Sequence, residues 1–329
     1  MSTSEATFWS YTQAQGESYA TGRPGYFPEL FKIILNHHAS SGGRLDTVLD
    51  VGCGTGQATG DLAPFFNNAI GIDPSEGMIT FARETIKSSA LSIRFEVSAA
   101  EALGIDLEPP IANNSVDLLT AATAAHWFDM TQFWRSAARV VEAGGTVALW
   151  ARTGMSVDPT ETPNGAAIKV AYYKQGNTLT RDLYVDLPLP WTIETPVTGF
   201  DKSGFICKEW SHNTESSETE DLGTGKTLTP EEFEKLIGTS SPVARWREAN
   251  PDKAGTEEDV ARKARGLIYS FLHEVGVELD EELLRGRTEL VLLMVKKEVE
   301  ERTQATKVSY DTPRRYIIYI GYIKKYICY

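Results

Sequence analysis

Apolar positions along the chain follow two patterns: short runs typical of buried strands, and longer stretches with the spacing of a helix. The short runs predict strands at residues 45–51, 69–73, 92–97, 116–121 and 146–150. Helical spacing separates them and is clearest over residues 129–142, at Met130, Phe133, Trp134, Ala137, Val140 and Val141. Strands that alternate with helices in this way indicate parallel βαβ units, with helices on both faces of the sheet.

The pattern changes on both sides of this core. Before it, a short helical pattern follows Pro28, a residue that often begins a helix. After it, residues 152–255 are rich in Pro, Thr, Gly and acidic residues, and only 205–210 is expected to form a strand. An amphipathic helix over 256–275 and a buried strand over 288–296 complete the expected elements.

The composition is that of an ordinary soluble globular protein, with 329 residues of which 41% are hydrophobic and 23% charged. No stretch approaches the roughly 20 apolar residues that a membrane-spanning helix needs. Residues 1–12 lack the basic start and apolar run of a secretory signal. We therefore expect a cytoplasmic protein.

The formal net charge of −13 narrows the range of partners. Residues 301–329 are net basic, so the preceding part of the chain is more acidic than the total. Nucleic-acid binding depends on Lys and Arg that neutralise phosphates, so this charge argues against nucleic acids and anionic membranes and favours a small molecule. Cys53, Cys207 and Cys328 have neither metal-ligand nor disulfide spacing, so no metal is expected. The sequence does not predict an oligomeric state.

The strongest chemical signal is the segment VLDVGCGTG at residues 48–56, where an apolar strand leads into a Gly-rich turn. Glycine tolerates positive φ and lets another group approach the backbone closely. Such a turn at the carboxyl end of the first parallel strand forms one wall of a ligand crevice. The next strand ends in Asp73, and a carboxylate there is able to accept hydrogen bonds from ribose hydroxyls.

Two details of this motif favour S-adenosylmethionine over a dinucleotide. Asp50 lies immediately before the turn, where a carboxylate would repel phosphate and suits a ligand with an amino group and a sulfonium. Gly52, Gly54 and Gly56 are spaced G-x-G-x-G, whereas the dinucleotide fingerprint is G-x-G-x-x-G. An NAD-dependent oxidoreductase and a non-catalytic binding module of the same fold remain as alternatives.

The chain resembles class I S-adenosylmethionine-dependent methyltransferases, and specifically the fungal trans-aconitate methyltransferase-like family, over residues 8–298. Beside the glycine motif, the resemblance rests on YATGRPGY at 19–26, AHWFD at 125–129, and the C-terminal helix and strand. It implies transfer of a methyl group to an oxygen or nitrogen atom of a small metabolite, with a carboxylate as one candidate. Fungal secondary metabolism is one implied context.

The resemblance also implies an organisation of the chain. We expect an α/β fold with a Rossmann-like, seven-stranded, mostly parallel sheet flanked by helices, and a lid formed by an N-terminal segment and an insertion. The expected parts are an N-terminal lid segment at 1–40, a cofactor-binding core at 41–151, a cap insertion with one core strand at 152–255, a C-terminal helix and last core strand at 256–300, and a tail of unknown role at 301–329.

The residues that the resemblance assigns to the cofactor follow the ends of the first three strands. They are Asp50, Gly52, Cys53, Gly54 and Gly56 at the methionine end, Asp73 at the ribose, Met78 near the adenine, and the backbone of Ala99 and Ala100 at the adenine amino group. Related proteins often have Asp at the position of Ala99, so a side-chain contact to that amino group is not expected.

The acceptor is expected to lie beyond the fourth and fifth strands. His126 is the candidate general base, because histidine titrates near neutrality, although a packing role is the alternative and a carboxylate acceptor needs no base. Arg23 and Arg152 are candidates for binding an anionic acceptor, and a salt bridge to the acidic body is the alternative for Arg23. Tyr19 and Trp127 complete the candidate acceptor site.

Overall fold

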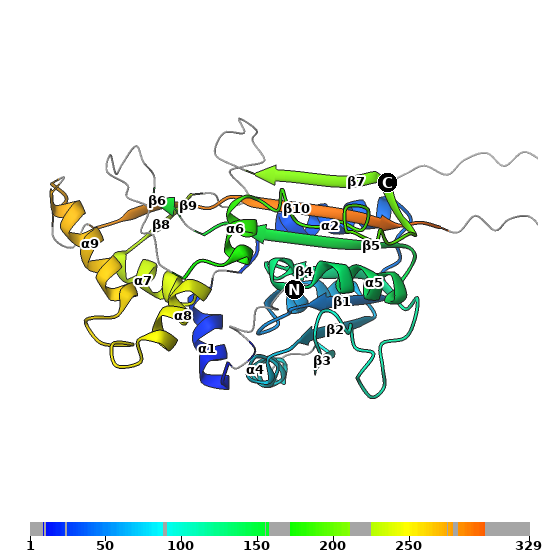
Figure 1. Cartoon of the computed structure of the whole chain (residues 1–329), viewed down its shortest axis with the longest axis horizontal. Coiled ribbons are helices and arrows are strands. Elements are labelled where there is room, and N and C mark those ends of the chain that lie inside the picture. Colours follow the sequence, from blue (N-terminus) through cyan, green and yellow to red (C-terminus); the bar gives the residue numbers. More distant parts are fainter. Residues whose placement is uncertain are drawn as a thin grey trace, which may run out of the picture. The chain divides into compact units, whose positions relative to one another are not determined.

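A seven-stranded sheet with the strand order β3-β2-β1-β4-β5-β10-β7 lies at the centre of the fold (Figure 1). Its strands are β1 (Thr47–Val51), β2 (Asn68–Asp73), β3 (Ile93–Val97), β4 (Val116–Ala122), β5 (Val141–Arg152), β7 (Phe200–Trp210) and β10 (Leu290–Lys297). Strands β1 to β5 run parallel to one another, and β10 runs antiparallel to both β5 and β7. This architecture confirms the predicted Rossmann-like, seven-stranded and mostly parallel sheet.

The computed structural model describes residues 9, 11–23, 25–87, 91–154, 156–157, 172–210, 225–274, 276–278 and 282–299. The tail at 301–329 therefore lies outside the described residues. Among the helices that the structure does describe, none is long and apolar enough to cross a membrane.

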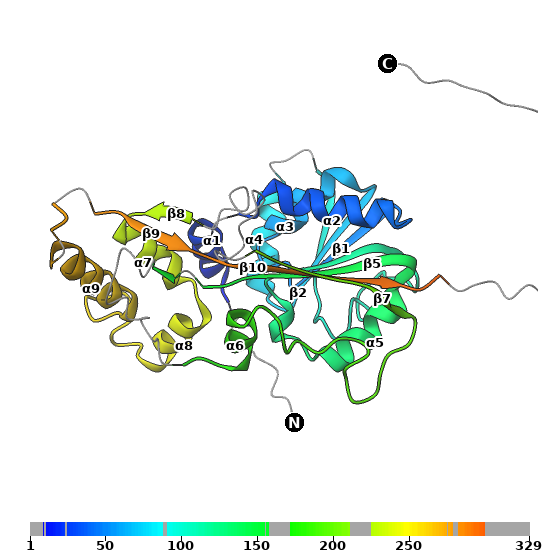
Figure 2. The same cartoon turned by 90° about the horizontal axis from the view of Figure 1, so that it is seen from above.

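Helices cover both faces of the sheet because residues on each strand alternate between two apolar cores. Val48 and Leu118 pack on one face with α2 (Pro28–Ser40) and α3 (Gln57–Leu62). Leu49 and Leu119 pack on the other face with α5 (Met130–Val140). Figure 2 shows α2 and α3 on one side of the sheet and α5 on the other. Near β3, α4 (Glu76–Ile86) packs on Phe95.

Two of the boundaries that differ from the prediction have a clear physical reason. The helix expected to reach residue 142 ends at Val140, because Val141 already pairs with Val116 as the first residue of β5. Strand β7 begins at Phe200 rather than at residue 205. Its first part carries exposed polar residues that hide the pattern, while the buried Phe200 ring packs edge-on against Trp134 at 5.3 Å.

A second group of elements, called the cap here, lies in sequence between β5 and β10, with β7 of the central sheet among them. Its sheet has the order β6-β9-β8, with β6 (Ser156–Val157), β8 (Gly225–Leu228) and β9 (Leu284–Arg287). Its helices are α6 (Gln175–Arg181), α7 (Pro230–Gly238), α8 (Ser241–Ala249) and α9 (Val260–Glu274). The apolar stripe of α9 packs on Phe233 of α7 and on Leu284, so this predicted helix belongs to the cap core.

Helix α1 (Gln13–Gly22) lies between the core and the cap, where it contacts both α4 and α7 (Figure 2). A side chain at Gly22 would approach Cγ2 of Thr239 to 2.6 Å, which shows how closely α1 meets the end of α7. The N-terminal segment therefore reaches the edge of the sheet beside the cap. Its expected role as a lid stays a prediction.

Candidate active site

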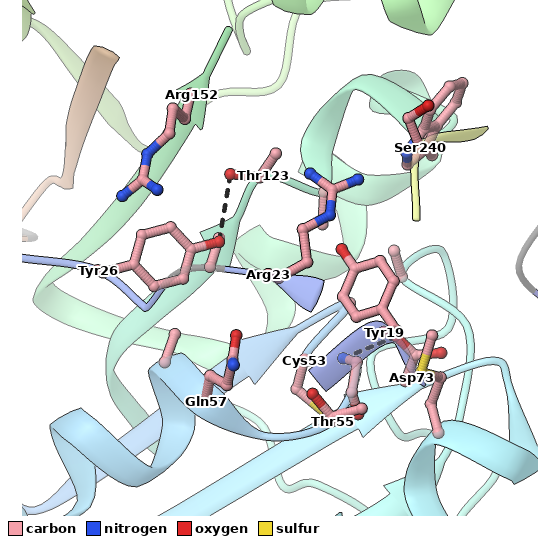
Figure 3. A pocket seen from close by; sticks show the side chains of 18 of the residues that line it. Tyr19, Arg23, Tyr26, Cys53, Thr55, Gln57, Asp73, Thr123, Arg152 and Ser240 are labelled. Carbon is pink, nitrogen blue, oxygen red and sulfur yellow. Dashed lines mark hydrogen bonds between the residues drawn. The ribbon is translucent and has the colours of Figure 1, made fainter. Parts of the chain in front are cut away.

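A pocket opens at the carboxyl ends of strands β1 to β5, which is where open α/β sheets bind their ligands. The sheet edge contributes Gly52, Cys53, Gly54, Thr55, Asp73, Pro74, Ala99, Ala100, Glu101, Ala122, Thr123, Ala124 and Arg152. The N-terminal segment and the cap contribute Tyr19, Arg23, Tyr26, Phe27, Leu236, Ile237 and Ser240. Figure 3 shows this pocket from close by.

Most of the predicted site residues meet in this pocket. Those that line it are Tyr19, Arg23, Gly52, Cys53, Gly54, Asp73, Met78, Ala99, Ala100, Trp127 and Arg152. Within the described part of the chain, Asp50, Gly56 and His126 are not among the lining residues. The roles expected for these three residues stay predictions.

The glycine turn requires glycine for two reasons. Gly52 and Gly54 have φ values of +64° and +55°, which L-residues with a side chain rarely adopt. A Cβ at Gly52 would also lie 2.7 Å from the Cβ of Ala124, whereas a Cβ at Gly54, which lines the pocket, would have no atom within 4 Å. The N–H of Cys53 donates to the carbonyl of Ile72 at 3.0 Å, which ties the turn to β2. The turn thus leaves backbone exposed to a ligand.

Gly56 has a packing role. Its φ is +83°, and a Cβ there would approach the ring of Phe95 to 2.6 Å. Gly56 is also the N-cap of α3. The residue lets the chain turn into α3 against that ring, behind the pocket wall.

Asp50 is buried behind the glycine turn and does not reach the pocket. Its Oδ2 accepts a hydrogen bond from the hydroxyl of Thr59 at 2.6 Å, and its Oδ1 accepts one from Thr120 at 2.8 Å. Burial raises the pKa of this carboxyl to about 6. The carboxylate joins β1 to α3 and β4, so it positions the turn.

Asp73 ends β2 with its carboxylate in the pocket wall. Its Oδ2 accepts the backbone N–H of Gly54 at 3.0 Å, and its Oδ1 accepts that of Ser75 at 2.8 Å. Burial raises its pKa to about 6, so the group is mostly ionised at neutral pH. Each oxygen keeps a lone pair for a ligand, and a carboxylate oriented in this way fits a ribose diol.

The adenine part of the predicted site lies beside Asp73. Met78 is almost fully buried and lines the pocket together with Ala99 and Ala100. The hydroxyl of Ser98 accepts the N–H of Gly104 at 3.1 Å, which holds the turn that follows β3. With the carboxylate of Asp73, these residues fit an adenosine-type ligand.

Arg23 and Arg152 line the other part of the pocket (Figure 3). Nη2 of Arg23 donates to the carbonyl of Thr239 at 3.2 Å, while its Nε is buried without a hydrogen-bond partner. Nη2 of Arg152 donates to the carbonyl of Gly25 at 3.1 Å. In the part of the chain that the structure describes, neither guanidinium pairs with a carboxylate.

The two cations are close enough to affect each other. Burial lowers the pKa of Arg152, and the charge of Arg23 lowers it further. The guanidinium of Arg23 lies 5.0 Å from the ring centroid of Tyr19, and that of Arg152 lies 5.1 Å from that of Phe27. Aromatic rings thus support both guanidinium groups, whose unused N–H donors suit an anionic ligand.

His126 lies beside the pocket and not in it. Its Nδ1 is 2.8 Å from the hydroxyl of Tyr184, and its ring lies 4.5 Å from that of Trp127. Burial, with a smaller effect from Arg23, lowers its pKa to about 3, so the imidazole is neutral at physiological pH. The expected general base is therefore separated from the pocket by Trp127, and its catalytic role stays a prediction.

Trp127 forms part of the pocket wall, and two cap helices hold it there. A Cβ at Gly176 of α6 would lie 2.3 Å from its ring, so only glycine leaves room for the indole. The guanidinium of Arg245 in α8 lies 6.0 Å from the ring centroid. Cap residues thereby determine the shape of a pocket that begins on the core.

Sequence reasoning missed several lining residues. Tyr26 belongs to the YATGRPGY segment, which carries part of the family resemblance, but the resemblance assigned no role to this tyrosine. Thr123 follows β4 with a φ of +54°. No local sequence pattern predicts a left-handed conformation for this threonine. Leu236, Ile237 and Ser240 come from and just after α7, far from the glycine motif in sequence. Among the described residues, no group of His, Cys, Asp or Glu is placed to hold a metal ion.

Part of the chain is similar to proteins that are named methyltransferases. Residues 49–149 match the family described as "Methyltransferase domain". The chain is 38% identical over 134 residues to a protein of Dictyostelium discoideum named a methyltransferase, covering 41% of this chain and 46% of that one. It is 33% identical over 171 residues to a Saccharomyces cerevisiae protein named an S-adenosylmethionine-dependent methyltransferase, covering 51% of this chain and 54% of that one. The chain thus matches about half the length of these curated relatives.

A solved structure extends the likeness beyond the matched domain. A protein from Anaeromyxobacter dehalogenans named a type II methyltransferase superposes with a TM-score of 0.53 at 22% identity, covering 84% of this chain and 98% of that one. This likeness shows a shared fold. The domain match itself is confined to residues 49–149. The narrower resemblance to the trans-aconitate methyltransferase-like family stays a prediction.

Proposed function

We propose that this protein is an S-adenosylmethionine-dependent methyltransferase that methylates an oxygen or nitrogen atom of a small acidic metabolite. One observation carries the proposal. The pocket combines an adenosine-type site around Asp73 with Arg23 and Arg152, which have no carboxylate partner in the described part of the chain. The methyltransferase domain and the named cofactor of the yeast relative support the choice of cofactor.

Residues of the sheet edge would hold the cofactor. The carboxylate of Asp73 would accept hydrogen bonds from the ribose, the exposed backbone at Gly54 would face the amino-acid part, and Met78 would pack on the adenine. When bound, S-adenosylmethionine supplies a methyl group on a sulfonium, and the acceptor atom takes it as the carbon–sulfur bond breaks with its electron pair staying on sulfur. The work of the protein is then to align the acceptor with that methyl group.

The arginines favour a carboxylate as the acceptor. The chain carries a net charge of −13, so an anionic metabolite needs local positive charge to enter. Guanidinium groups bind carboxylates through paired N–H donors, and Arg23 and Arg152 both keep donors available. A carboxylate is already anionic and needs no base, which agrees with the position of His126 outside the pocket lining.

Two finer expectations belong to the same proposal. The resemblance to the fungal trans-aconitate methyltransferase-like family supports a role in fungal secondary metabolism. The absence of a spanning helix among the described residues is compatible with the proposed cytoplasmic location.

Calorimetry with S-adenosylmethionine and NADH, followed by transfer of labelled methyl to a panel of organic acids, phenols and amines, tests the proposal. We expect binding of S-adenosylmethionine alone and label on one or more acids. Binding of NADH instead would indicate an oxidoreductase. Cofactor binding without label transfer to the panel or to a cell extract would indicate a non-catalytic module.

A further inference from the structure

Thr123 has a backbone conformation that is unusual for its residue type. It follows β4 at the pocket edge with a φ of +54°, in the left-handed region that β-branched residues rarely adopt. Its N–H donates to the carbonyl of Trp150 at 2.7 Å, so the neighbouring strand holds the residue in place. Strained residues of this kind persist where the surrounding structure enforces them, and they concentrate at functional sites.

The strained conformation brings the Thr123 hydroxyl to Tyr26. The phenol of Tyr26 donates to Oγ1 of Thr123 at 3.2 Å. Because that lone pair is taken, the threonine proton points elsewhere, and no acceptor for it is found among the described residues. A donor hydroxyl in a pocket wall with its proton unused is available to a ligand.

Tyr26 is held rigidly. Its ring makes edge-on contacts with Trp150 at 5.6 Å and Phe31 at 6.3 Å, and the guanidinium of Arg152 lies 5.7 Å from its centroid. Burial raises its pKa to about 12, so the phenol keeps its proton and remains a donor at physiological pH. The direction of the Thr123 hydroxyl is therefore determined by a side chain with little freedom to move.

The hydroxyl pair lies next to both arginines. Figure 3 shows Tyr26 and Thr123 with Arg152 on one side and Arg23 on the other, around one part of the pocket. Two guanidinium groups attract an anion, but they offer several alternative N–H donors. They alone therefore do not fix the orientation of the methyl acceptor. A single neutral donor between them would select one orientation.

We propose that Thr123 is a substrate-binding residue whose hydroxyl donates to one carboxylate oxygen of the methyl acceptor, and that Tyr26 is a positioning residue that directs this hydroxyl. The proposal rests on the proposed function. With one oxygen of the carboxylate bound to Thr123, the other oxygen is directed towards the methyl group. Thr123 would thereby favour carboxylic acids over phenols and amines, which lack a second oxygen.

Steady-state kinetics of Thr123→Val, Thr123→Ser and Tyr26→Phe test the proposal, with trans-aconitate and a panel of mono- and dicarboxylic acids as acceptors. Thr123→Val removes the hydroxyl at constant shape, and Thr123→Ser keeps it. We expect Thr123→Val and Tyr26→Phe to raise KM for the acid about tenfold, with cofactor affinity within twofold of wild type. Thr123→Ser should remain within threefold of wild type.

A purely structural role predicts a different result. Loss of thermal stability with unchanged KM in Thr123→Val and Tyr26→Phe would overturn the proposal. If Thr123→Val does not fold, Tyr26→Phe decides, since it removes one oxygen atom from a supported ring. A wild-type protein that binds S-adenosylmethionine but neither binds nor methylates any acid of the panel also overturns it. Failure to bind S-adenosylmethionine would instead contradict the proposed function.

Discussion

The backbone N–H of Gly54 donates a hydrogen bond to Oδ2 of Asp73 at 3.0 Å. This contact joins the turn after β1 to the end of β2, at the edge where the pocket opens. A second donor, the N–H of Ser75, holds Oδ1 at 2.8 Å. The carboxylate is therefore oriented before a ligand arrives, and the adenosine part of the proposed site depends on it.

Replacing Asp73 by Asn should weaken the binding of S-adenosylmethionine at least tenfold. The substitution removes a charge and one of two acceptor oxygens, and a hydrogen bond to a charged group contributes about 1.5–3 kcal/mol. Calorimetry measures the affinity, and the melting temperature shows whether the fold is kept. Asp252→Asn, at an exposed position between α8 and α9, is the matched control. An unchanged affinity in Asp73→Asn would show that the ribose lies elsewhere.

The affinity for S-adenosylmethionine should also fall at acidic pH. Burial raises the pKa of Asp73 to about 6, so the carboxylate is ionised above that pH and protonated below it. Protonation removes acceptor capacity, and the dissociation constant should rise roughly tenfold between pH 7 and pH 5. Titrations across this range check the slope, and Asp73→Asn should show a flatter profile. An equal slope in the two proteins would assign the effect to another group.

Arg23→Lys and Arg152→Lys should each lower kcat/KM for an acidic acceptor by about tenfold. Lysine keeps the charge but cannot reproduce the paired N–H donors of a guanidinium. Cofactor affinity should stay within about twofold, since neither residue lies in the adenosine part of the proposed site. Arg181→Lys, which changes an exposed arginine paired with Asp182, is the matched control. Full activity of both pocket variants would point to a neutral acceptor.

His126→Gln should keep turnover within about threefold of wild type, because the imidazole does not line the pocket. The variant should differ in the pH dependence of stability. Burial lowers the pKa of His126 to about 3 in the fold, so the unfolded chain takes up a proton first and stability is lost as pH falls below about 6.5. Urea unfolding at pH 7 and pH 5 should show a smaller loss for His126→Gln, by about 1–2 kcal/mol. A hundredfold loss of kcat in His126→Gln would instead indicate that His126 acts as a general base.

Local sequence was enough to predict the part of the site that one segment builds. The apolar run into Gly52 and Gly54 predicts a strand and a turn, because only glycine adopts positive φ there without strain. Asp73 was predictable for a related reason. Parallel strands bring their carboxyl ends to the same sheet edge, so an acid that ends the second strand must lie beside the first turn. Strand alternation with helices likewise predicts the sheet and its two covered faces.

Side-chain direction and long-range contacts lie beyond that reasoning. Asp50 and His126 are each close in sequence to lining residues, yet Asp50 turns to two threonines and His126 to Tyr184. The left-handed conformation of Thr123 arises from its contacts with Trp150 and Tyr26, which come from different parts of the chain. The cap wall depends on how α7 packs against α1, and no periodicity along a single segment encodes such a contact. The direction of a side chain follows from the partners that burial forces on it, and those partners are known only when distant segments have packed together.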